Sequence, residues 1–433
     1  MRYISTSGRA PAVTLKTALL DGLAPDGGLY MPEMLPRAGA ELLASLRGAP
    51  FEKTAAAFAG LLLGDEIPGP ILGGLISSAL DFPVPLVRVT KSIHILELFH
   101  GPTCAFKDVG ARVLARLLSH LAGDERRITV LVATSGDTGG AVASAFFGLP
   151  AARVVILYPR GQISRLQEAQ IATLGGNVEA VSVAGTFDDC QRMVKEAFAD
   201  GEVRRRLTLT SANSINVGRL LPQTFYYFHA AGLLASGDQP LIFSTPSGNF
   251  GNLTAGLMAK RMGLPAERFV AATNVNDVVP SYLATGLYAP RPSIRTISNA
   301  MDVGAPSNFA RMLALYDGDV AAMRRDVIGS RQADEATRDC IRRVFEQHGR
   351  VLDPHTAVGY LGLEEALEAG AAPAMGIVLA TAHPAKFPEV IEPILGRPPE
   401  LPETLKKCLD RPVLSREMPP SLAPLRDLLL EGA

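Results

Sequence analysis

From residue 92 onward, the chain alternates between short apolar runs and segments whose apolar residues follow helical spacing. The apolar runs are rich in Val, Ile and Leu and are bounded by glycine-rich or polar turns, which is typical of strands buried on both faces. We expect strands at 92–99, 127–134, 153–159, 177–183, 207–212, 240–246, 268–273 and 374–381. Helices are expected from about Ser164 to Leu174 and from near Thr186. This alternation predicts an α/β fold with parallel sheets covered by helices, and a chain of 433 residues can form more than one such sheet.

The same pattern predicts how the chain divides into domains. We expect residues 1–90 to form a mainly helical N-terminal region, residues 91–126 and 230–433 to form a large α/β domain, and residues 127–229 to form a small one. Proline-rich stretches at 397–403 and 416–424 are expected to be loops, because proline cannot donate to a helix or sheet ladder.

Composition and charge exclude several classes of protein. Hydrophobic residues make up 47% of the chain and charged residues 20%, which indicates a globular protein. The net charge of −1 gives no reason to expect a nucleic-acid or membrane partner. The four cysteines are far apart and indicate reduced thiols, and the N-terminus has no apolar signal core, so we expect a cytoplasmic protein. We expect a monomer or a small homo-oligomer.

A lysine stands in an unusual place in the stretch ELFHGPTCAFKDVGARVLARLLSHLAG. Lys107 falls in the opening turn of an apolar helix that we expect Thr103 to cap and Gly123 to end. A cation is disfavoured there, because the N-terminal end of a helix is the positive pole of its dipole. The position therefore indicates either a functional lysine or a surface lysine whose charge reaches solvent.

Polar loops follow several of the expected strands, at the sheet edge where α/β proteins bind ligands. In TSGDTGGA (134–141), the glycines allow close approach of the backbone, and Ser135, Asp137 and Thr138 stand beside the first N–H groups of a helix. Together with Gly136, these residues suit a carboxylate or a phosphate. An ordinary capped turn is the alternative interpretation.

A second loop, TPSGNFGN (245–252), also leads from a strand into a helix. Gly248 and Gly251 expose backbone amides, and Asn249 and Asn252 add side-chain donors, so the loop suits a phosphate. It lacks the third glycine of a dinucleotide fingerprint, and no Gly-Lys pair of a P-loop occurs in the chain. A structural turn remains the alternative.

Two further loops complete the candidates. TSANSINVGRLLPQ (210–223) brings four donors close together, and its arginine suits a bidentate contact with phosphate; these donors are Asn213, Ser214, Asn216 and Arg219. In ATAHPAKF (380–387), the hydroxyl of Thr381 ends a strand and can face a ligand, whereas His383 before a proline favours a structural role. The histidines form no metal-spaced set, so no metal site is predicted.

Taken together, a lysine at a helix N-terminus and a phosphate loop point to one kind of cofactor chemistry. A lysine beside cationic groups and shielded from water has a lowered pKa, and its neutral amine can form a Schiff base. A phosphate cradle combined with such a lysine suggests pyridoxal 5'-phosphate.

The chain resembles the threonine synthases, a family of fold-type II pyridoxal-phosphate enzymes related to the tryptophan synthase β subunit, and in particular their microbial form with a long N-terminal region. The resemblance extends almost from end to end and includes DGGLYMPE, HGPTCAFKDVGARVL, TSGDTGGA, NSINVGR, PSGNFGN, SNAMDVGAPSNFAR and TAHPAKF.

This resemblance implies a role for each candidate residue. Lys107 would carry the cofactor as a Schiff base, Thr381 would face its pyridine nitrogen, and its phosphate would be held by Gly248, Asn249, Phe250, Gly251 and Asn252. The substrate carboxylate would be held by Ser135, Gly136, Asp137 and Thr138. The substrate phosphate would be held by Asn213, Ser214, Asn216 and Arg219.

The implied reaction converts O-phospho-L-homoserine and water to L-threonine and phosphate. Two alternatives remain open at this point. A related pyridoxal-phosphate lyase would eliminate phosphate from the same kind of substrate and stop at 2-oxobutyrate. A non-enzymatic phosphometabolite-binding protein would not need Lys107.

Overall fold

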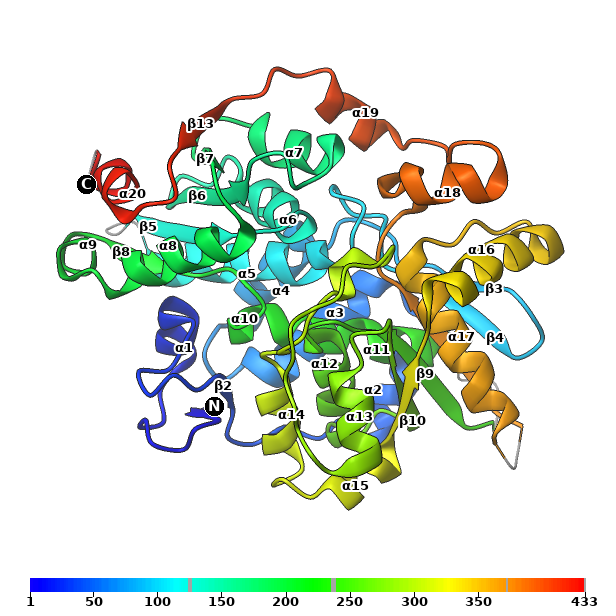
Figure 1. Cartoon of the computed structure of the whole chain (residues 1–433). Coiled ribbons are helices and arrows are strands. Elements are labelled where there is room, and N and C mark those ends of the chain that lie inside the picture. The colour runs from blue at the N-terminus through cyan, green and yellow to red at the C-terminus, as the bar shows by residue number, and fades with distance from the viewer. Residues whose placement is uncertain (124–126, 235–238, 371–372, 432–433) are drawn as a thin grey trace. The chain divides into compact units, whose positions relative to one another are not determined.

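The computed structural model describes residues 1–123, 127–234, 239–370 and 373–431, which form two compact units (Figure 1). The first unit comprises Met1, Met31–Phe106 and Leu220–Glu400. The second comprises Arg2–Tyr30, Lys107–Arg219 and Leu401–Ala433.

This division differs from the expected domain boundaries, and tertiary packing explains the difference. Helix α5 (Lys107–Ala122) packs against α6 (Asp137–Phe146), so it groups with the second unit and not with the large domain. Helix α1 (Leu15–Asp21) contacts α5, and residues 401–433 return to the same unit. No feature of the local sequence marks these contacts, because each joins segments that are far apart along the chain.

The first unit is built on a six-stranded sheet with the order β11-β10-β9-β12-β4-β3. All neighbouring strands are parallel except β3 and β4, which are antiparallel. The strands are β3 (Leu86–Arg88), β4 (Ile93–Glu97), β9 (Leu241–Pro246), β10 (Ala266–Thr273), β11 (Val327–Arg331) and β12 (Met375–Ala380). The expected strands in this part of the chain are confirmed. Strand β11 was not predicted, because VIGSR is short and contains glycine.

The central strands of this sheet are buried on both faces. Ile242 and Val270 contribute to the core beneath α17 (Pro354–Glu368), which contacts β9, β10 and β12. The neighbouring residues Phe243 and Phe269 point the other way, and their rings stack at 5.8 Å. This alternation explains why the strands read as continuous apolar runs and not as alternating ones.

Helices form the rest of the first unit. The N-terminal helices α3 (Phe51–Leu63) and α4 (Gly69–Ala79) pack on each other, and α3 also contacts α11 (Gln223–Leu234). The remaining helices are α2 (Ala40–Ser45), α3 (Phe51–Leu63), α4 (Gly69–Ala79), α11 (Gln223–Leu234), α12 (Gly251–Arg261), α13 (Val278–Thr285), α14 (Phe309–Leu315), α15 (Val320–Asp326), α16 (Asp334–His348) and α18 (Pro388–Leu395), with the short 3₁₀ turns η1 (Asn299–Met301) and η2 (Pro384–Lys386).

The second unit contains a five-stranded parallel sheet with the order β13-β7-β6-β5-β8. The strands are β5 (Ile128–Ala133), β6 (Ala152–Pro159), β7 (Val178–Val183), β8 (Thr208–Thr210) and β13 (Ser415–Met418). The prediction that residues 416–424 are a loop is wrong at both ends, because residues 416–418 belong to β13 and residues 422–424 begin α20 (Leu422–Leu430). Strand β13 pairs with β7 at the edge of the sheet, where exposed charges such as Arg416 and Glu417 are favoured and no apolar run is needed.

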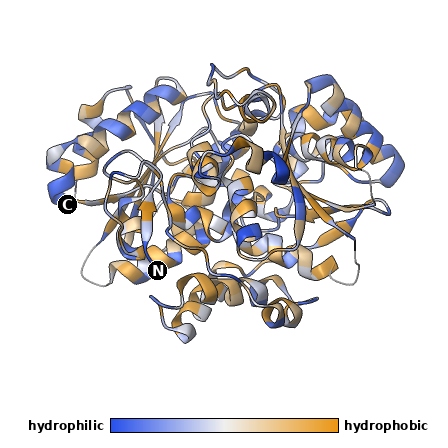
Figure 2. Cartoon of the chain, turned by 90° about the horizontal axis from the view of Figure 1, so that it is seen from below, coloured by the Kyte–Doolittle hydropathy of each residue, from blue (hydrophilic) through white to orange (hydrophobic). Residues whose placement is uncertain are grey.

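Helices cover this sheet on both faces. Helices α8 (Phe187–Ala199) and α20 (Leu422–Leu430) pack on each other, and with the strands they bury a core that includes Val155, Met193 and Leu425. Helix α6 contacts β6 and lies between α5 and α7. Figure 2 shows hydrophobic residues along the strands and a mixture of hydrophobic and hydrophilic residues along the helices. The helices not yet placed are α7 (Arg165–Ala172), α8 (Phe187–Ala199), α9 (Gly201–Arg206), α19 (Glu403–Leu409) and α20 (Leu422–Leu430).

The predicted helix starts at Ser164 and Thr186 are confirmed, and both residues form capping boxes with the residue three positions later. Three short elements complete the fold: β1 (Tyr3–Ser5), β2 (Tyr30–Pro32) and α10 (Val217–Leu220). Across the described parts of the chain, every helix is too short or too polar to cross a bilayer.

Candidate active site

The segment that leads to Lys107 is fixed against the end of a strand. The Phe106 N–H donates to the Thr381 carbonyl at 2.9 Å, and Ala105 forms an antiparallel bridge with Ala382. The His383 N–H donates to the carbonyl of Cys104, which has a positive φ of 55°. These bonds hold the backbone up to Phe106, and Lys107 is the next residue, so the position of its Cα is tightly defined.

The expected cap of this helix is wrong. Helix α5 begins at Lys107, and Thr103 instead accepts a bond from Lys386 Nζ through its carbonyl, at 3.0 Å. The chain cannot be helical from residue 104, because Ala105 is in a bridge with Ala382. Lys107 is therefore the first helical residue, and its side chain is half-buried.

Thr381 lies at the end of β12 and is 6% exposed. Its carbonyl is used by Phe106, whereas its hydroxyl makes no hydrogen bond to any residue that the structure describes. The hydroxyl can therefore serve a ligand, as the sequence predicts. His383 does not have this freedom, because its Nδ1 accepts from the Ala385 N–H at 3.2 Å and its ring meets Phe99 edge-on.

The loop before α12 adopts the geometry of an anion cradle. Phe250 has a left-handed backbone with φ of 60°, and Gly251 begins the helix. Asn252 shapes the loop from inside: its Nδ2 donates to the Pro246 carbonyl at 2.8 Å, and its Oδ1 accepts from Ser247 Oγ at 3.0 Å. The Leu253 N–H in the first turn of α12 donates to the same Asn252 Oδ1 at 3.0 Å, whereas the N–H groups of Gly251 and Asn252 have no acceptor within the helix and can serve an anion.

Gly248 and Gly251 differ in what a side chain at each position would contact. A Cβ on Gly248 would lie 2.7 Å from the Met301 Cα, so this glycine allows η1 to pack against the loop. A Cβ on Gly251 would meet nothing closer than Asn308 Nδ2, at 3.4 Å. That buried nitrogen has no hydrogen-bond partner among the described residues. A buried donor without a partner, beside the N-terminus of a helix, fits a phosphate group.

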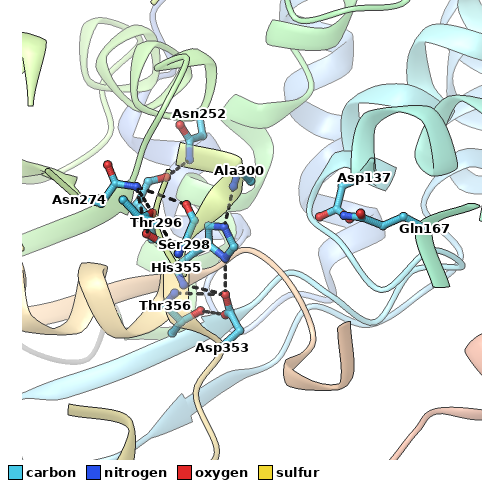
Figure 3. A network of polar contacts seen from close by, with 11 residues as sticks. Asp137, Gln167, Asn252, Asn274, Thr296, Ser298, Ala300, Asp353, His355 and Thr356 are labelled. Carbon is cyan, nitrogen blue, oxygen red and sulfur yellow. Dashed lines mark hydrogen bonds and ion pairs between the residues drawn. The ribbon is translucent and has the colours of Figure 1, made fainter. Parts of the chain in front are cut away.

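A buried polar network holds η1 in place behind this loop (Figure 3). His355 Nε2 accepts from the Ala300 N–H at 3.2 Å, and its Nδ1 lies 2.8 Å from Asp353 Oδ1. Nδ1 therefore carries the proton and donates to the carboxylate. Asn274 Nδ2 donates to the side chains of Thr296 and Ser298, which Figure 3 labels, and to Asp302 Oδ1 at 2.9 Å.

In the second unit, the loop TSGDTGGA is closed by a side chain that sequence reasoning missed. Gly136 has φ of 143°, and a Cβ there would lie 2.4 Å from Gln167 Nε2. The same nitrogen donates to Asp137 Oδ1 at 3.1 Å, a pair seen in Figure 3. Asp137 is buried, whereas Ser135 is exposed and Thr138 is half-exposed. Ser135 and Thr138 are therefore the side chains of this loop that a ligand can reach.

The loop NSINVGR divides its residues between structural contacts and accessible positions. Asn216 is fully buried, and its Nδ2 donates to the carbonyls of Leu19 and Ser211, both at 2.9 Å. Its Oδ1 accepts from the Gly218 N–H at 2.9 Å, so the amide already serves the fold. Asn213 and Ser214 are half-exposed. The contact expected between Asn216 and a substrate phosphate stays a prediction.

Arg219 is buried against the start of α5. Its Nη1 donates to the Ala212 carbonyl at 2.6 Å, and a Cβ on Gly110 would lie 2.6 Å from the Arg219 carbonyl. Burial lowers the pKa of Arg219 to about 10, and the fully buried carboxylate of Asp108 opposes this decrease. The guanidinium therefore remains cationic at neutral pH.

The comparisons with known proteins cover the whole chain. Residues 2–80 match the family model "Threonine synthase N terminus", residues 81–381 match "Pyridoxal-phosphate dependent enzyme", and residues 356–428 match "Threonine synthase, C-terminal". The threonine synthase of Escherichia coli (strain K12) is 45% identical over 431 residues, covering 99% of each chain. The chain belongs to the threonine synthase family.

Solved structures of this family share the fold. The crystal structure of the Escherichia coli threonine synthase has a TM-score of 0.91 at 43% identity and covers 100% of both chains. A pyridoxal-phosphate-bound threonine synthase from Brucella melitensis has a TM-score of 0.93 at 38% identity and covers 99% of this chain and 98% of that one. The fold-type II class predicted from the sequence is confirmed, as is the cofactor, pyridoxal phosphate.

Within this threonine synthase fold, each unit brings some of the predicted residues together. The first unit contains the loop Gly248–Asn252 and Thr381. Its segment Met31–Phe106 ends directly before Lys107. The second unit contains the loops around Asp137 and Arg219. Among the described residues, no cluster of His, Cys, Asp and Glu could hold a metal ion.

The residues that sequence reasoning missed all act through tertiary contacts. Gln167 is the third helical residue of α7 and forms a capping box with Ser164. This pattern predicts a helix start but does not predict the hydrogen bond from Gln167 to Asp137. Asn308 lies in SNAMDVGAPSNFAR, one of the segments that carry the family resemblance, and His355 lies in the first turn of α17. Neither is near Gly248 or Gly251 along the chain, so local patterns could not connect them.

Proposed function

We propose that the protein converts O-phospho-L-homoserine and water to L-threonine and phosphate, with pyridoxal 5'-phosphate as cofactor. The observation that carries the proposal is the placement of Lys107, which directly follows a segment bonded to the strand end at Thr381. Pure binding of a phosphometabolite gives no reason to fix a lysine in this way. Full-length similarity to threonine synthases supports the choice of substrate.

Pyridoxal phosphate, when bound, supplies an electron sink for negative charge that develops next to the substrate amino group. We propose that the Lys107 amine binds its aldehyde covalently, that residues Gly248–Asn252 hold its phosphate, and that the Thr381 hydroxyl faces its ring nitrogen. A hydroxyl at that position does not force the nitrogen to stay protonated, as a carboxylate would.

The substrate is held by the second set of residues in this proposal. Ser135, Gly136 and Thr138 bind its carboxylate at the start of α6, and Asp137 keeps the loop in shape through its bond to Gln167. The substrate phosphate is bound by Asn213, Ser214, Asn216 and Arg219. Once the amino group of the substrate has taken its place on the cofactor aldehyde, the freed Lys107 amine would remove the Cα proton and then a Cβ proton, and phosphate would leave from Cγ. Water would add at Cβ, and protons would return to Cγ and Cα.

The identity of the product separates this function from the nearest alternative. Purified protein incubated with O-phospho-L-homoserine should release phosphate and L-threonine in equal amounts, measured by a phosphate assay and amino-acid analysis. Release of 2-oxobutyrate without threonine would assign the lyase reaction. A colourless protein that binds the substrate unchanged would contradict the proposal that the protein is an enzyme.

The cytoplasmic location of the protein stays a prediction.

Replacing Thr381 by valine is expected to lower kcat while the cofactor stays bound. Valine keeps the volume but leaves the ring nitrogen without a partner, which costs about 1–3 kcal/mol for a buried polar group. This corresponds to a decrease of about 5- to 150-fold, measured by steady-state kinetics together with the cofactor absorption spectrum. Thr381→Ser, which keeps the hydroxyl, is the matched control and should retain most of the activity. Unchanged kinetics in Thr381→Val would reduce Thr381 to a packing residue.

A further inference from the structure

Asn308 is a buried side chain with an unused donor at the N-terminal end of α12. It is 0% exposed, and it directly precedes α14 (Phe309–Leu315). Its Nδ2 has no hydrogen-bond partner among the residues that the structure describes. Buried polar groups in proteins almost always have a partner, so this nitrogen indicates an acceptor that is not part of the chain.

The orientation of the Asn308 amide is fixed by an arginine. Asn308 Oδ1 accepts from Arg311 Nη1 at 2.6 Å. Arginine has donors only, so the oxygen and not the nitrogen must face it. A flipped amide would place two donors against each other. Burial lowers the pKa of Arg311 to about 9, which leaves it protonated at neutral pH and therefore able to hold this orientation.

The donor of Asn308 is directed at the loop that precedes α12. The position of a Cβ on Gly251 would be 3.4 Å from Asn308 Nδ2 and 4.0 Å from Gln223 Nε2. Asn249 ties the two segments together, because its Oδ1 accepts from the Ser307 N–H at 2.5 Å. Two side-chain amides and the first-turn N–H groups therefore border the same small volume, and all of these groups lie in the first unit.

We propose that Asn308 is a phosphate-binding residue of the site at the N-terminus of α12, and that Arg311 is the positioning residue that turns its amide toward the anion. The proposal rests on the proposed function in one respect, namely that the anion is the phosphate of pyridoxal phosphate. It adds to the loop Gly248–Asn252 a ligand from a distant part of the chain.

The test measures cofactor affinity in full-length protein from which the cofactor has been removed with hydroxylamine. Wild-type protein, Asn308→Ala and Asn308→Asp are titrated with pyridoxal phosphate and with pyridoxal, which lacks the phosphate, and binding is followed by absorbance. Loss of one hydrogen bond to a charged group should weaken pyridoxal phosphate binding about 10- to 100-fold in Asn308→Ala. Binding of pyridoxal should change little.

The aspartate variant separates phosphate binding from a structural role. Its carboxylate still accepts from Arg311, but it places a negative oxygen where Nδ2 stood, so it should weaken pyridoxal phosphate binding more than alanine does. A structural role predicts the reverse order, because aspartate keeps the shape and the bond to Arg311. A milder effect of aspartate than of alanine, or equal losses for both ligands, would overturn the proposal.

A matched control and a second ligand make the outcomes distinct. Asn177 donates to the carbonyls of Phe146, Leu149 and Ala152 in the second unit, so Asn177→Ala should lower the melting temperature and leave cofactor affinity unchanged. Thermal stabilisation by inorganic phosphate is measured in all variants.

If the wild type binds phosphate but not pyridoxal phosphate, and Asn308→Asp weakens phosphate binding more than Asn308→Ala does, the anion site stands and the proposed function fails. If wild type binds pyridoxal phosphate and the variants bind it equally, only the role of Asn308 fails. If wild type binds neither, both fail.

The positioning role of Arg311 has its own readout. Arg311→Met should weaken pyridoxal phosphate binding as Asn308→Ala does. Without the bond from Arg311 Nη1 to Asn308 Oδ1, nothing fixes the orientation in which the Asn308 Nδ2 faces the phosphate loop. Arg311→Lys keeps a charged donor at this position and should recover part of the affinity. Unchanged affinity in Arg311→Met would contradict the positioning role.

Discussion

Replacing Lys107 by alanine is expected to abolish turnover while the fold and the phosphate site remain intact. In the proposed reaction, one amine binds the cofactor and then moves protons at both Cα and Cβ, so no other residue can substitute for it. General acid–base catalysis alone contributes about 10²–10⁴ to a rate, and the covalent role adds to this. We therefore expect kcat to fall by at least about 10³-fold.

This expectation is checked by steady-state kinetics together with the absorption spectrum. Lys107→Ala should lose the Schiff-base band near 410–420 nm, roughly where this cofactor absorbs when it is bound to lysine. It should still bind the cofactor weakly through the loop Gly248–Asn252. Lys195, an exposed lysine in α8, provides the control, and Lys195→Ala should behave as wild type. Retention of both the band and the activity in Lys107→Ala would overturn the assignment of the lysine.

Replacing Arg219 by alanine is expected to lower kcat/KM for O-phospho-L-homoserine by about 10²–10⁴, the range for a buried charge contact worth about 3–5 kcal/mol. The guanidinium is cationic at neutral pH, because its pKa of about 10 is still well above 7. A phosphate gains negative charge as it leaves, so a cation held in place favours its departure. Arg219→Lys should also lose much of the activity, because lysine cannot make the bidentate contact.

Comparing substrates separates the phosphate contact from general damage. Serine or threonine, which carry no phosphate, should undergo their slow side elimination with a much smaller loss in Arg219→Ala. Arg153 is a matched control in the same unit, since it is also buried and donates to the carbonyls of Leu428 and Leu429. Arg153→Ala should lose stability and keep its kcat/KM at a temperature where it is folded. Equal losses on both substrates in Arg219→Ala would remove Arg219 from the phosphate site.

The strands of both sheets could be predicted from sequence because burial on both faces gives them an unmistakable apolar pattern. The runs that became β5, β6, β9 and β12 are examples, and each is buried along nearly its whole length. Strand β13 could not be predicted in this way. Its sequence SREM buries only Met418, and it exists because β7 offers an open edge.

In the candidate site too, local sequence patterns predict the loops but not the residues that reach them through tertiary contacts. The glycine and asparagine spacing of PSGNFGN predicts a loop for an anion, because local backbone geometry decides that property. Asn308 and His355 instead act across more than fifty residues of intervening chain, through contacts to the Gly251 region and to Ala300. The Thr103 cap was wrong for a related reason: a bridge between Ala105 and Ala382 competes with the helix, and the partner segment lies far away in sequence.

The family resemblance contributed what neither propensity nor spacing could supply, namely the choice of substrate. The phosphate loop and the lysine are compatible with several reactions, because a fold and a cofactor do not by themselves select one. The central claim of the proposed function is therefore the specific reaction, in which phosphate leaves from Cγ and water adds at Cβ.

Isotope analysis of a single reaction in ¹⁸O-labelled water tests this central claim most directly. Purified protein is incubated with unlabelled O-phospho-L-homoserine, and the products are analysed by mass spectrometry. Cleavage of the Cγ–O bond followed by addition of water at Cβ predicts L-threonine with ¹⁸O in its hydroxyl and phosphate without ¹⁸O. Homoserine together with ¹⁸O-labelled phosphate, or 2-oxobutyrate in place of threonine, would contradict the account.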